Sequence, residues 1–294
     1  MLRPLLTAAC AALALASTAA HAQSSSSVTL LEPGAAPRQA LRYRFESGRT
    51  ETARMDTTMQ LTMVATGVQM PVMAATPIAI EIRLRTAEVA ADGSAKLQFE
   101  VLSAAASGDS GAAAQLNPTL ATLKGLSGTY SLDPRGQVTT SQTALPGAAL
   151  GAAPTAADIE EQMQQMALPL PAEAVGPGAR WRAVQQTSAN GLEVTQTTEY
   201  TLRSRNGEQL ELDVKIVDVT LPDLSGMVPG ASVSSATMSG GGPMTVNLAG
   251  LVPRGALDVE MAISMSLDLQ GTSQAMAMHM KMKQAIAPAA AKTN

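Results

Sequence analysis

The amino-acid sequence predicts a mainly β fold: two related antiparallel meanders that form a curved half-barrel or a flattened barrel, with one helix across the open side. First, apolar and polar residues alternate with period two over long stretches, which is typical of strands with one buried and one solvated face. Second, Gly- and Pro-containing turn signals separate these stretches. Roughly ten to twelve strands of this length curl or close, because large flat sheets are rare.

The longest alternating stretch, residues 191–221, predicts a long hairpin. Its two arms carry apolar residues at alternate positions, and the faces coincide if Leu202 lies opposite Leu210. That register leaves a three-residue loop, Arg205 to Gly207, with Gly in the left-handed position of a bulged hairpin. A two-residue Asn-Gly loop is rejected because it places Leu202 opposite Glu211.

A second hairpin is predicted around Asp92-Gly93. A two-residue turn there pairs Leu84 with Val101 and keeps the apolar faces together. The segments that flank Asp133-Pro134-Arg135-Gly136 form a third hairpin, because this tetrapeptide is a strong turn signal.

The first residues indicate export. Arg3 precedes a Leu/Ala-rich apolar run, and Ala20-His21-Ala22 is a small-x-small cleavage site. The chain is therefore expected to be a bacterial periplasmic or secreted protein, cleaved after Ala22. Cleavage before Cys10, as in a lipoprotein, is disfavoured because it leaves almost no apolar run upstream.

The composition of the exported chain excludes several classes of function. Removal of residues 1–22 removes the single Cys, one of the 2 His and Arg3, so 19 basic residues (20 − 1) face 24 acidic ones, a net charge of −5. No disulfide and no thiolate metal ligand remain. Without a basic run, neither nucleic acid nor an anionic membrane surface is an expected partner. No other apolar stretch is long enough to span a membrane, so the exported chain is not expected to be integral to one.

The organisation of the chain follows from these patterns. A helix at about 155–167 begins with the capping box of Thr155 and Asp158 and ends at Pro169. Loops are expected at 104–114 and at Gly240-Gly241-Gly242-Pro243, the latter mobile and near a sheet edge. The predicted parts are a signal peptide (1–22), a flexible leader (23–38) with a short strand at 28–31, a first β meander (39–143), a linker and helix (144–175), a second β meander (176–287) and a flexible tail (288–294).

The two halves share a pattern, which predicts related meanders. Each begins with an aromatic strand, at 41–45 and at 179–184, and continues into a long hairpin. Each also ends on a Pro-Arg-Gly turn, at 134–136 and at 253–255.

These motifs also carry a resemblance. The first segment is Leu41-Arg42-Tyr43-Arg44-Phe45, followed by Gly48 and a Thr/Met-rich strand. The second is Gly176-Pro177-Gly178-Ala179-Arg180-Trp181-Arg182. Together they resemble a family of uncharacterised exported bacterial β-rich proteins. The likeness covers most of the exported chain and implies fold and location only. A more distant likeness, in architecture alone, is to the curved-sheet carriers of lipoproteins and lipids in the bacterial envelope.

The run from Met276 to Met282 has two interpretations. Thioether sulfurs are soft ligands that suit Cu(I). However, the four Met residues share one face of a strand while His279 lies on the other, which favours a core-facing strand with Met as an adaptable filler. No metal site and no cofactor are therefore expected.

Catalytic residues are not expected. His279 is the only histidine of the exported chain, and no Gly-x-Ser-x-Gly elbow is present. The carboxylates near Asp158 suit a helix N-terminus, and Glu211 and Asp213 suit a solvated strand face. The six aromatic residues are too few for a sugar-binding surface.

The leading hypothesis is a non-enzymatic exported protein that binds or carries an apolar small molecule, a lipid or a lipidated partner. The alternatives are a self-packed concave face without a cavity, an envelope structural or protein-interaction module that pairs through an edge strand, and, less favoured, a Cu(I)-binding protein. The candidate ligand-binding residues on the concave face are Met59, Met63, Met163, Met261, Met265, Met278 and Met280.

Overall fold

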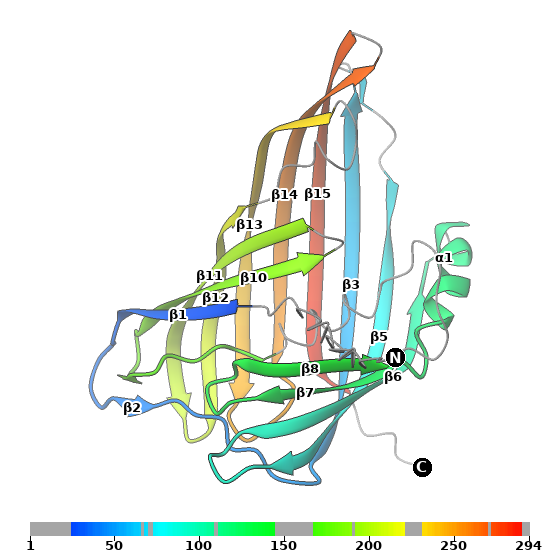
Figure 1. The fold of residues 1–294 in the computed structure, drawn as a ribbon. Helices are drawn as coiled ribbons and strands as arrows, with labels where there is room; N and C mark the ends of the chain where they lie inside the picture. The colour runs from blue at the N-terminus through cyan, green and yellow to red at the C-terminus, as the bar shows by residue number, and fades with distance from the viewer. Residues whose placement is uncertain are drawn as a thin grey trace, which may run out of the picture.

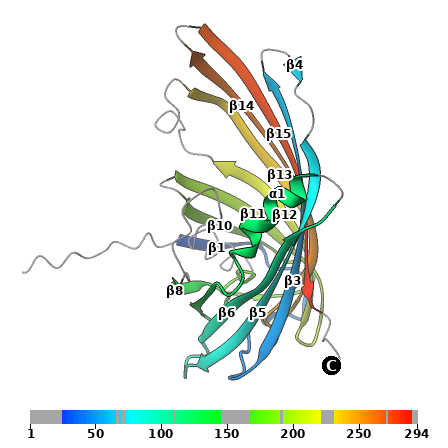
Figure 2. The same cartoon turned by 90° about the vertical axis from the view of Figure 1, so that its right-hand side faces the viewer.

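The computed structural model describes residues 25–65, 68–69, 73–108, 111–144, 167–189, 192–220, 231–269 and 272–289. Within them the chain forms a large, curved antiparallel sheet with one helix (Figure 1). The sheet does not close into a barrel, which confirms the predicted mainly β half-barrel. Figure 2 shows the long strands bending along their length.

Two meanders make up the sheet. The first contains β3 (Thr50–Ala65), β5 (Met73–Val89), β6 (Ala95–Ala106), β7 (Ser127–Leu132) and β8 (Val138–Ala144). The second contains β10 (Arg180–Ala189), β11 (Leu192–Asn206), β12 (Gln209–Thr220), β13 (Ala231–Asn247), β14 (Arg254–Leu269) and β15 (Thr272–Pro288). The short β4 (Val68–Gln69) pairs with β3, and β2 (Gln39–Ala40) pairs with β9 (Ala174–Val175).

The meanders join through β15 and β3, the last strand of one and the first long strand of the other. The strand order is β1-β10-β11-β12-β13-β14-β15-β3-β5-β6-β7-β8, so β1 (Ser25–Glu32) and β8 form the two edges. The short strand predicted at 28–31 is confirmed, but it is longer than expected: residues 25–32 pair with β10 over most of their length, so this part of the leader is not flexible. An ion pair between Glu32 and Arg180 (2.7 Å) adds to this attachment.

The aromatic segment 41–45 is not a strand, contrary to the sequence prediction. Its backbone instead bridges two loops: the Tyr43 N–H donates to the carbonyl of Pro134, and the Arg44 N–H donates to that of Leu248, both at 2.8 Å. Tyr43 and Phe45 stack on each other with ring centroids 5.6 Å apart. Thus the aromatic residues fill the interior and do not extend the sheet.

The hairpin registers differ from those predicted, although the buried faces are the same. Leu202 lies opposite Leu212, and the turn is the pair Gly207-Glu208 between Asn206 and Gln209. A bulge between Leu202 and Ser204 brings the apolar residues back into phase after this short turn.

The hairpin of β5 and β6 shows the same effect. Leu84 lies opposite Phe99 and not opposite Val101, because the loop spans residues 90–94 and a further irregularity lies between Thr86 and Glu88. The third predicted hairpin is confirmed: β7 and β8 flank the turn at 133–136, closed by a 2.9 Å bond from the Gly136 N–H to the Asp133 carbonyl.

The described helix, α1 (Gly111–Ala121), was not predicted, and its first four residues lie in the loop expected at 104–114. It packs beside the upper part of β6, where β7 no longer pairs. The Asn117 amide accepts the Ala106 N–H (2.8 Å) and donates to the Ala106 carbonyl (3.2 Å), as a neighbouring strand would. The helix predicted at about 155–167 falls almost wholly outside the described residues, which omit 145–166.

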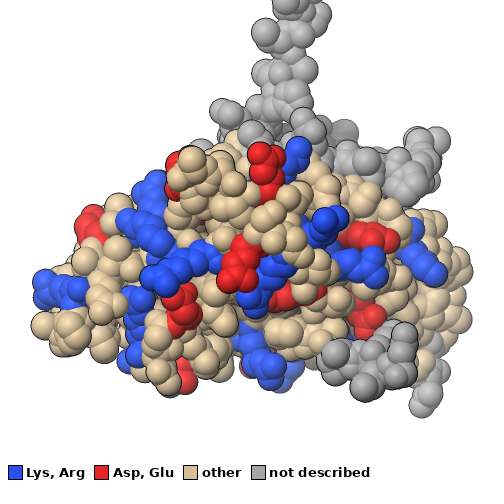
Figure 3. Space-filling model, turned by 90° about the horizontal axis from the view of Figure 1, so that it is seen from below, with Lys and Arg blue, Asp and Glu red and all other residues tan. Residues whose placement is uncertain are grey.

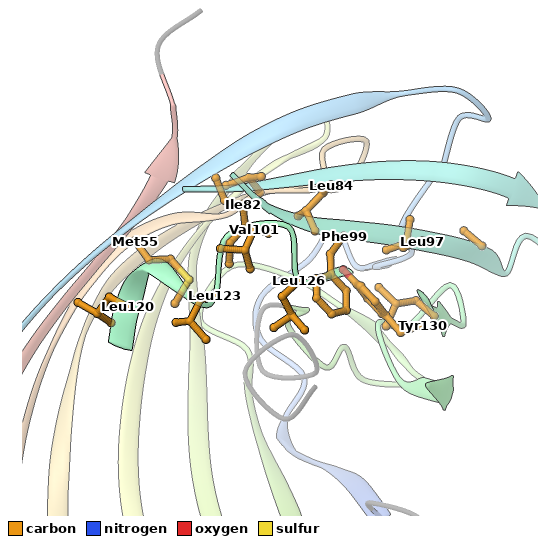
Figure 4. Packing of buried hydrophobic residues seen from close by; sticks show 14 of the residues in the cluster. Met55, Ile82, Leu84, Leu97, Phe99, Val101, Leu120, Leu123, Leu126 and Tyr130 are labelled. Atoms are coloured by element: carbon orange, nitrogen blue, oxygen red, sulfur yellow. The ribbon is translucent and has the colours of Figure 1, made fainter. Parts of the chain in front are cut away.

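The interior of the curve is filled from two sides. On the β3–β7 side, Leu120 and Leu123 lie near Met55, and Leu126 lies near Phe99 and Tyr130 (Figure 4). On the β10–β13 side the core is built around Trp181, Leu202, Leu210 and Leu212. The strands β3 and β13 to β15 extend well beyond α1 and beyond the short strands β7 and β8 (Figure 1).

The glycine run 240–242 lies within β13, not in an edge loop as predicted. It pairs with β12 on one side and aligns with β14 on the other, without a register shift. A Cβ at Gly242 would overlap the Ala256 carbonyl, and one at Gly240 would overlap the Asp258 carbonyl. The glycines therefore permit a close approach of backbones inside the sheet.

The substitution Gly242→Ala should lower the free energy of unfolding by at least about 2 kcal/mol, because the new methyl group meets backbone that cannot rotate away. Chemical denaturation followed by circular dichroism measures this change. The matched control is Gly111→Ala in α1, where a Cβ meets no atom within 4 Å and stability should be almost unchanged. Equal stability of both variants would contradict this account of the glycine run.

Candidate functional site

Residues 167–173 cross the concave face as a strap. The Leu168 N–H donates to the Tyr43 hydroxyl (3.1 Å), the Trp181 indole N–H donates to the Pro169 carbonyl (2.9 Å), and the Leu170 N–H donates to the Arg135 carbonyl (2.8 Å). Leu168 and Leu170 are buried beneath the strap. The strap is thus fixed to the sheet by hydrogen bonds along its length.

Arg42 holds the far end of the strap. Its guanidinium donates to the carbonyls of Pro171 (2.9 Å) and Ala172 (2.6 Å). Trp181 is fully buried and stacks on Tyr200, with ring centroids 5.7 Å apart. Trp181 therefore belongs to the packed core and is not an exposed anchor for a partner.

Burial also controls the chemistry of the tyrosines. Desolvation raises the pKa of Tyr43 and of Tyr200 above the usual range, although each phenol has a hydrogen-bond partner that opposes the shift, Leu168 and Thr198 respectively. Both groups are therefore neutral near pH 7 and act as structural hydrogen-bonding groups.

A cavity of about 120 Å³ lies above the strap. Leu168 forms part of its lining, together with side chains from both meanders. The described lining residues are Met55, Leu168, Gln185, Gln196, Thr198, Tyr200, Val214, Ile216, Met244, Pro253, Gly255, Leu257, Gln284 and Ile286. The cavity is thus a mixed one, apolar over most of its wall, with a few uncharged polar groups.

The polar groups come mainly from β10 and β11. Gln185 and Gln196 are direct cross-strand partners, and the Gln196 amide donates to the Thr198 hydroxyl at 3.1 Å. Gln284 reaches the cavity from β15. None of the described lining residues is charged.

The predicted methionines lie together on the concave face above this cavity; the six described ones are named here the methionine face. The cross-strand pairing brings Met261 opposite Met280 and Met278 opposite Met63. Met59 is 49% exposed, and the other members are partly exposed. The methionine face consists of Met59, Met63, Met261, Met265, Met278 and Met280; Met163 falls outside the described residues.

The methionine face continues directly from the cavity. On β15 the next inward residue after Gln284 is Met282, which lies opposite Met59 of β3 and Val259 of β14. Met282 packs on the small cluster of Ile216, Val219 and Val259 at the upper border of the core. Cavity and methionine face are therefore parts of one surface, with the glutamines at its lower end.

The sequence analysis missed the polar end, although a signal was present. Gln196 and Gln284 occupy the parity of the buried positions in their strands, where an apolar residue is expected. Met238 and Met276, beside Met261 and Met265 in the register, extend the same inward surface.

Charged groups lie elsewhere. Lys281 pairs with Glu260 (3.0 Å) and Lys283 lies 3.7 Å from Asp258, all on the outer face of β14 and β15. Seen from below, basic and acidic side chains are intermixed over the surface (Figure 3). His279 is exposed and has the opposite parity to the methionines.

The described part of the chain contains no cluster of three or more His, Cys, Asp or Glu side chains that could hold a metal ion. The methionine thioethers are the soft ligands that this surface offers. Among the same residues, no helix is long and apolar enough to cross a membrane.

Leu168→Ala should lower the free energy of unfolding by about 2–5 kcal/mol, because it removes a buried side chain that packs between the strap and the cavity. Urea denaturation of the purified protein gives the difference. Leu116→Ala in α1 makes the same truncation at a side chain that is 38% exposed, and it should change stability by less than about 1 kcal/mol. If the two variants lose the same stability, the strap does not contribute to the core.

Comparison with known proteins gives no assignment: no family model matches the sequence, and no curated protein is significantly similar to it. What the protein does must therefore be inferred from the concave surface itself.

Proposed function

We propose that this is an exported, non-enzymatic protein that binds or carries an apolar molecule with a long chain. The observation that carries the proposal is the methionine face, an inward apolar surface that the core of the described chain does not cover. A large exposed apolar surface is unfavourable in water and is typical of a binding site. The predicted signal peptide supports a periplasmic or secreted location.

Methionine suits this role. Its side chain is unbranched and polarisable, so a surface of several Met residues adapts to ligands of different shape. The cross-strand pairs of Met261 with Met280 and of Met278 with Met63 make that surface continuous across three strands. A linear acyl chain laid along it would bury apolar area on both partners, and each buried methylene contributes roughly 0.8 kcal/mol.

The strap and cavity give the surface a closed lower end. The strap is anchored by Trp181 and Tyr43, so this end is rigid and formed before any ligand binds. Preformed sites bind at lower entropic cost than sites that order on binding. An upper surface that the described residues leave partly exposed and a rigid base together favour a chain-shaped ligand.

A second candidate function is an envelope interaction module that pairs through an edge strand. The edge strand β8 carries no charged residue along Val138–Ala144, and charges are the usual protection of an exposed edge. This function predicts a specific oligomer or a protein partner and no bound small molecule.

A test of the carrier proposal is the binding of an uncharged apolar dye, N-phenyl-1-naphthylamine, to the exported chain. The double variant Met261→Gln/Met280→Gln should weaken binding about tenfold, because two apolar contacts become polar at constant side-chain length. The matched control is Lys281→Gln/Lys283→Gln on the outer face of β15, which should bind as the unchanged protein does.

Native mass spectrometry of protein from a bacterial periplasm separates the two candidate functions. A discrete added mass that organic extraction removes supports the carrier. If the protein is an apo oligomer and both double variants bind the dye with equal affinity, the methionine face is not a binding site. That result favours the interaction module.

A further inference from the structure

We infer that the ligand is a free single-chain lipid with an uncharged, hydrogen-bonding head, and that the cavity above the strap receives this head. The inference rests on the proposed function and adds the chemistry of the ligand and its direction of binding. The chain lies along the methionine face, and the head lies beside Gln185, Gln196 and Gln284.

The three glutamines are the first reason. The side-chain carboxamides of Gln185 and Gln284 have no hydrogen-bond partner among the described residues, whereas the Gln196 carboxamide is oriented by its bond to the Thr198 hydroxyl. Each free carboxamide offers two N–H donors and a carbonyl acceptor. Such groups in an otherwise apolar wall match a ligand that carries both an acceptor and a donor, such as an ester or amide with a hydroxyl or N–H group.

The absence of charge from the described lining is the second reason. An ionised head would move from water into a cavity whose described lining offers no opposite charge, and burial of an unpaired charge is strongly unfavourable. The neighbouring charged residues do not compensate, because Asp258, Glu260, Lys281 and Lys283 pair with one another on the outer face. A carboxylate or an ammonium head is therefore disfavoured to a similar degree.

Size selects a free lipid over an acylated peptide. A cavity of about 150 Å³ in another protein holds one benzene molecule, which has six non-hydrogen atoms, so 120 Å³ admits a head of about five non-hydrogen atoms. A glycerol ester or a primary amide fits this limit, and a peptide backbone does not. Leu168 and the strap close the lower end, so the chain leaves toward the methionines.

The experiment compares three compounds that each carry a 16-carbon chain, by displacement of N-phenyl-1-naphthylamine from the full exported chain. They are 1-hexadecanoylglycerol, which is uncharged, hexadecanoate, which is anionic, and hexadecylamine, which is cationic at neutral pH. The uncharged compound should bind at least about tenfold more tightly than either charged one, because only the charged heads lose hydration without a partner. Equal affinities, or tighter binding of a charged compound, would overturn the inference and leave the carrier proposal intact.

Two variants locate the head. Gln185→Lys places an ammonium in the cavity, so hexadecanoate should gain at least about tenfold in affinity while hexadecylamine loses affinity. Gln185→Leu/Gln284→Leu should remove most of the preference for the uncharged compound and retain binding of the dye. Gln98→Leu, an exposed residue outside the cavity lining, is the matched control and should preserve the preference.

The outcomes distinguish the carrier function from the placement of an uncharged head in the cavity. If none of the three compounds displaces the dye and the dye itself does not bind, the carrier proposal fails. If all three bind alike and Gln185→Lys changes nothing, the carrier proposal stands and the placement of an uncharged head in the cavity is wrong.

Discussion

A single curved sheet has one inward face to bury, and this face is covered only where something inside the curve packs against it. Among the described residues, the strap at 167–173 and the segment from α1 to Leu126 supply that cover. The helix α1 lies beside the middle of the sheet, below the upper ends of β3 and β13 to β15 (Figures 1 and 2). The strands β3 and β13 to β15 continue beyond this cover with the same apolar parity, so the boundary between filled and open surface is decided by what covers the sheet, not by a change in the strands.

The binding surface follows from this boundary. Below it, Trp181 and Leu202 are buried in a packed core. Above it, residues of the same parity become partly exposed methionines. The three glutamines lie at the boundary. Their environment is less apolar than the packed core and more apolar than the solvated outer face. The gradient from Leu and aromatic residues to Gln and then to Met gives the surface a direction, and an asymmetric ligand has one favourable orientation on it.

The sequence alone predicts which face of the sheet each residue occupies, but it does not predict the register between neighbouring strands. Alternation fixes which face a residue takes, and six predicted methionines lie together for that reason. The register depends on bulges such as the one beside Arg203, which alternation cannot locate. Gly240 to Gly242 suggest a loop locally, but the approach of neighbouring strands requires them within β13. In α1, Asn117 and Pro118 obscure the helical pattern, and only the contact with Ala106 explains Asn117.

The polar end of the site was beyond sequence analysis for a related reason. Gln185, Gln196 and Gln284 come from β10, β11 and β15, and they share a cavity because the sheet curves between these strands. Alternation identifies a polar residue at a buried position, but curvature and strand order decide which of these residues meet. Leu168 joins them from a segment without regular structure, held by Tyr43 and Trp181.

The pairing of β15 with β3 also governs how the chain acquires its structure. Each meander can form from neighbours in sequence, but the seam between them joins Met282 to Met59, which are 223 residues apart (282 − 59) in a chain of 294. Contacts of such separation, like those between β1 and β10, form late, because a long loop must close before they contribute stability. The methionine face straddles this seam, so the surface does not exist until the final strand docks. Until then both halves expose unpaired apolar edges, and these intermediates are the species most vulnerable to aggregation during folding.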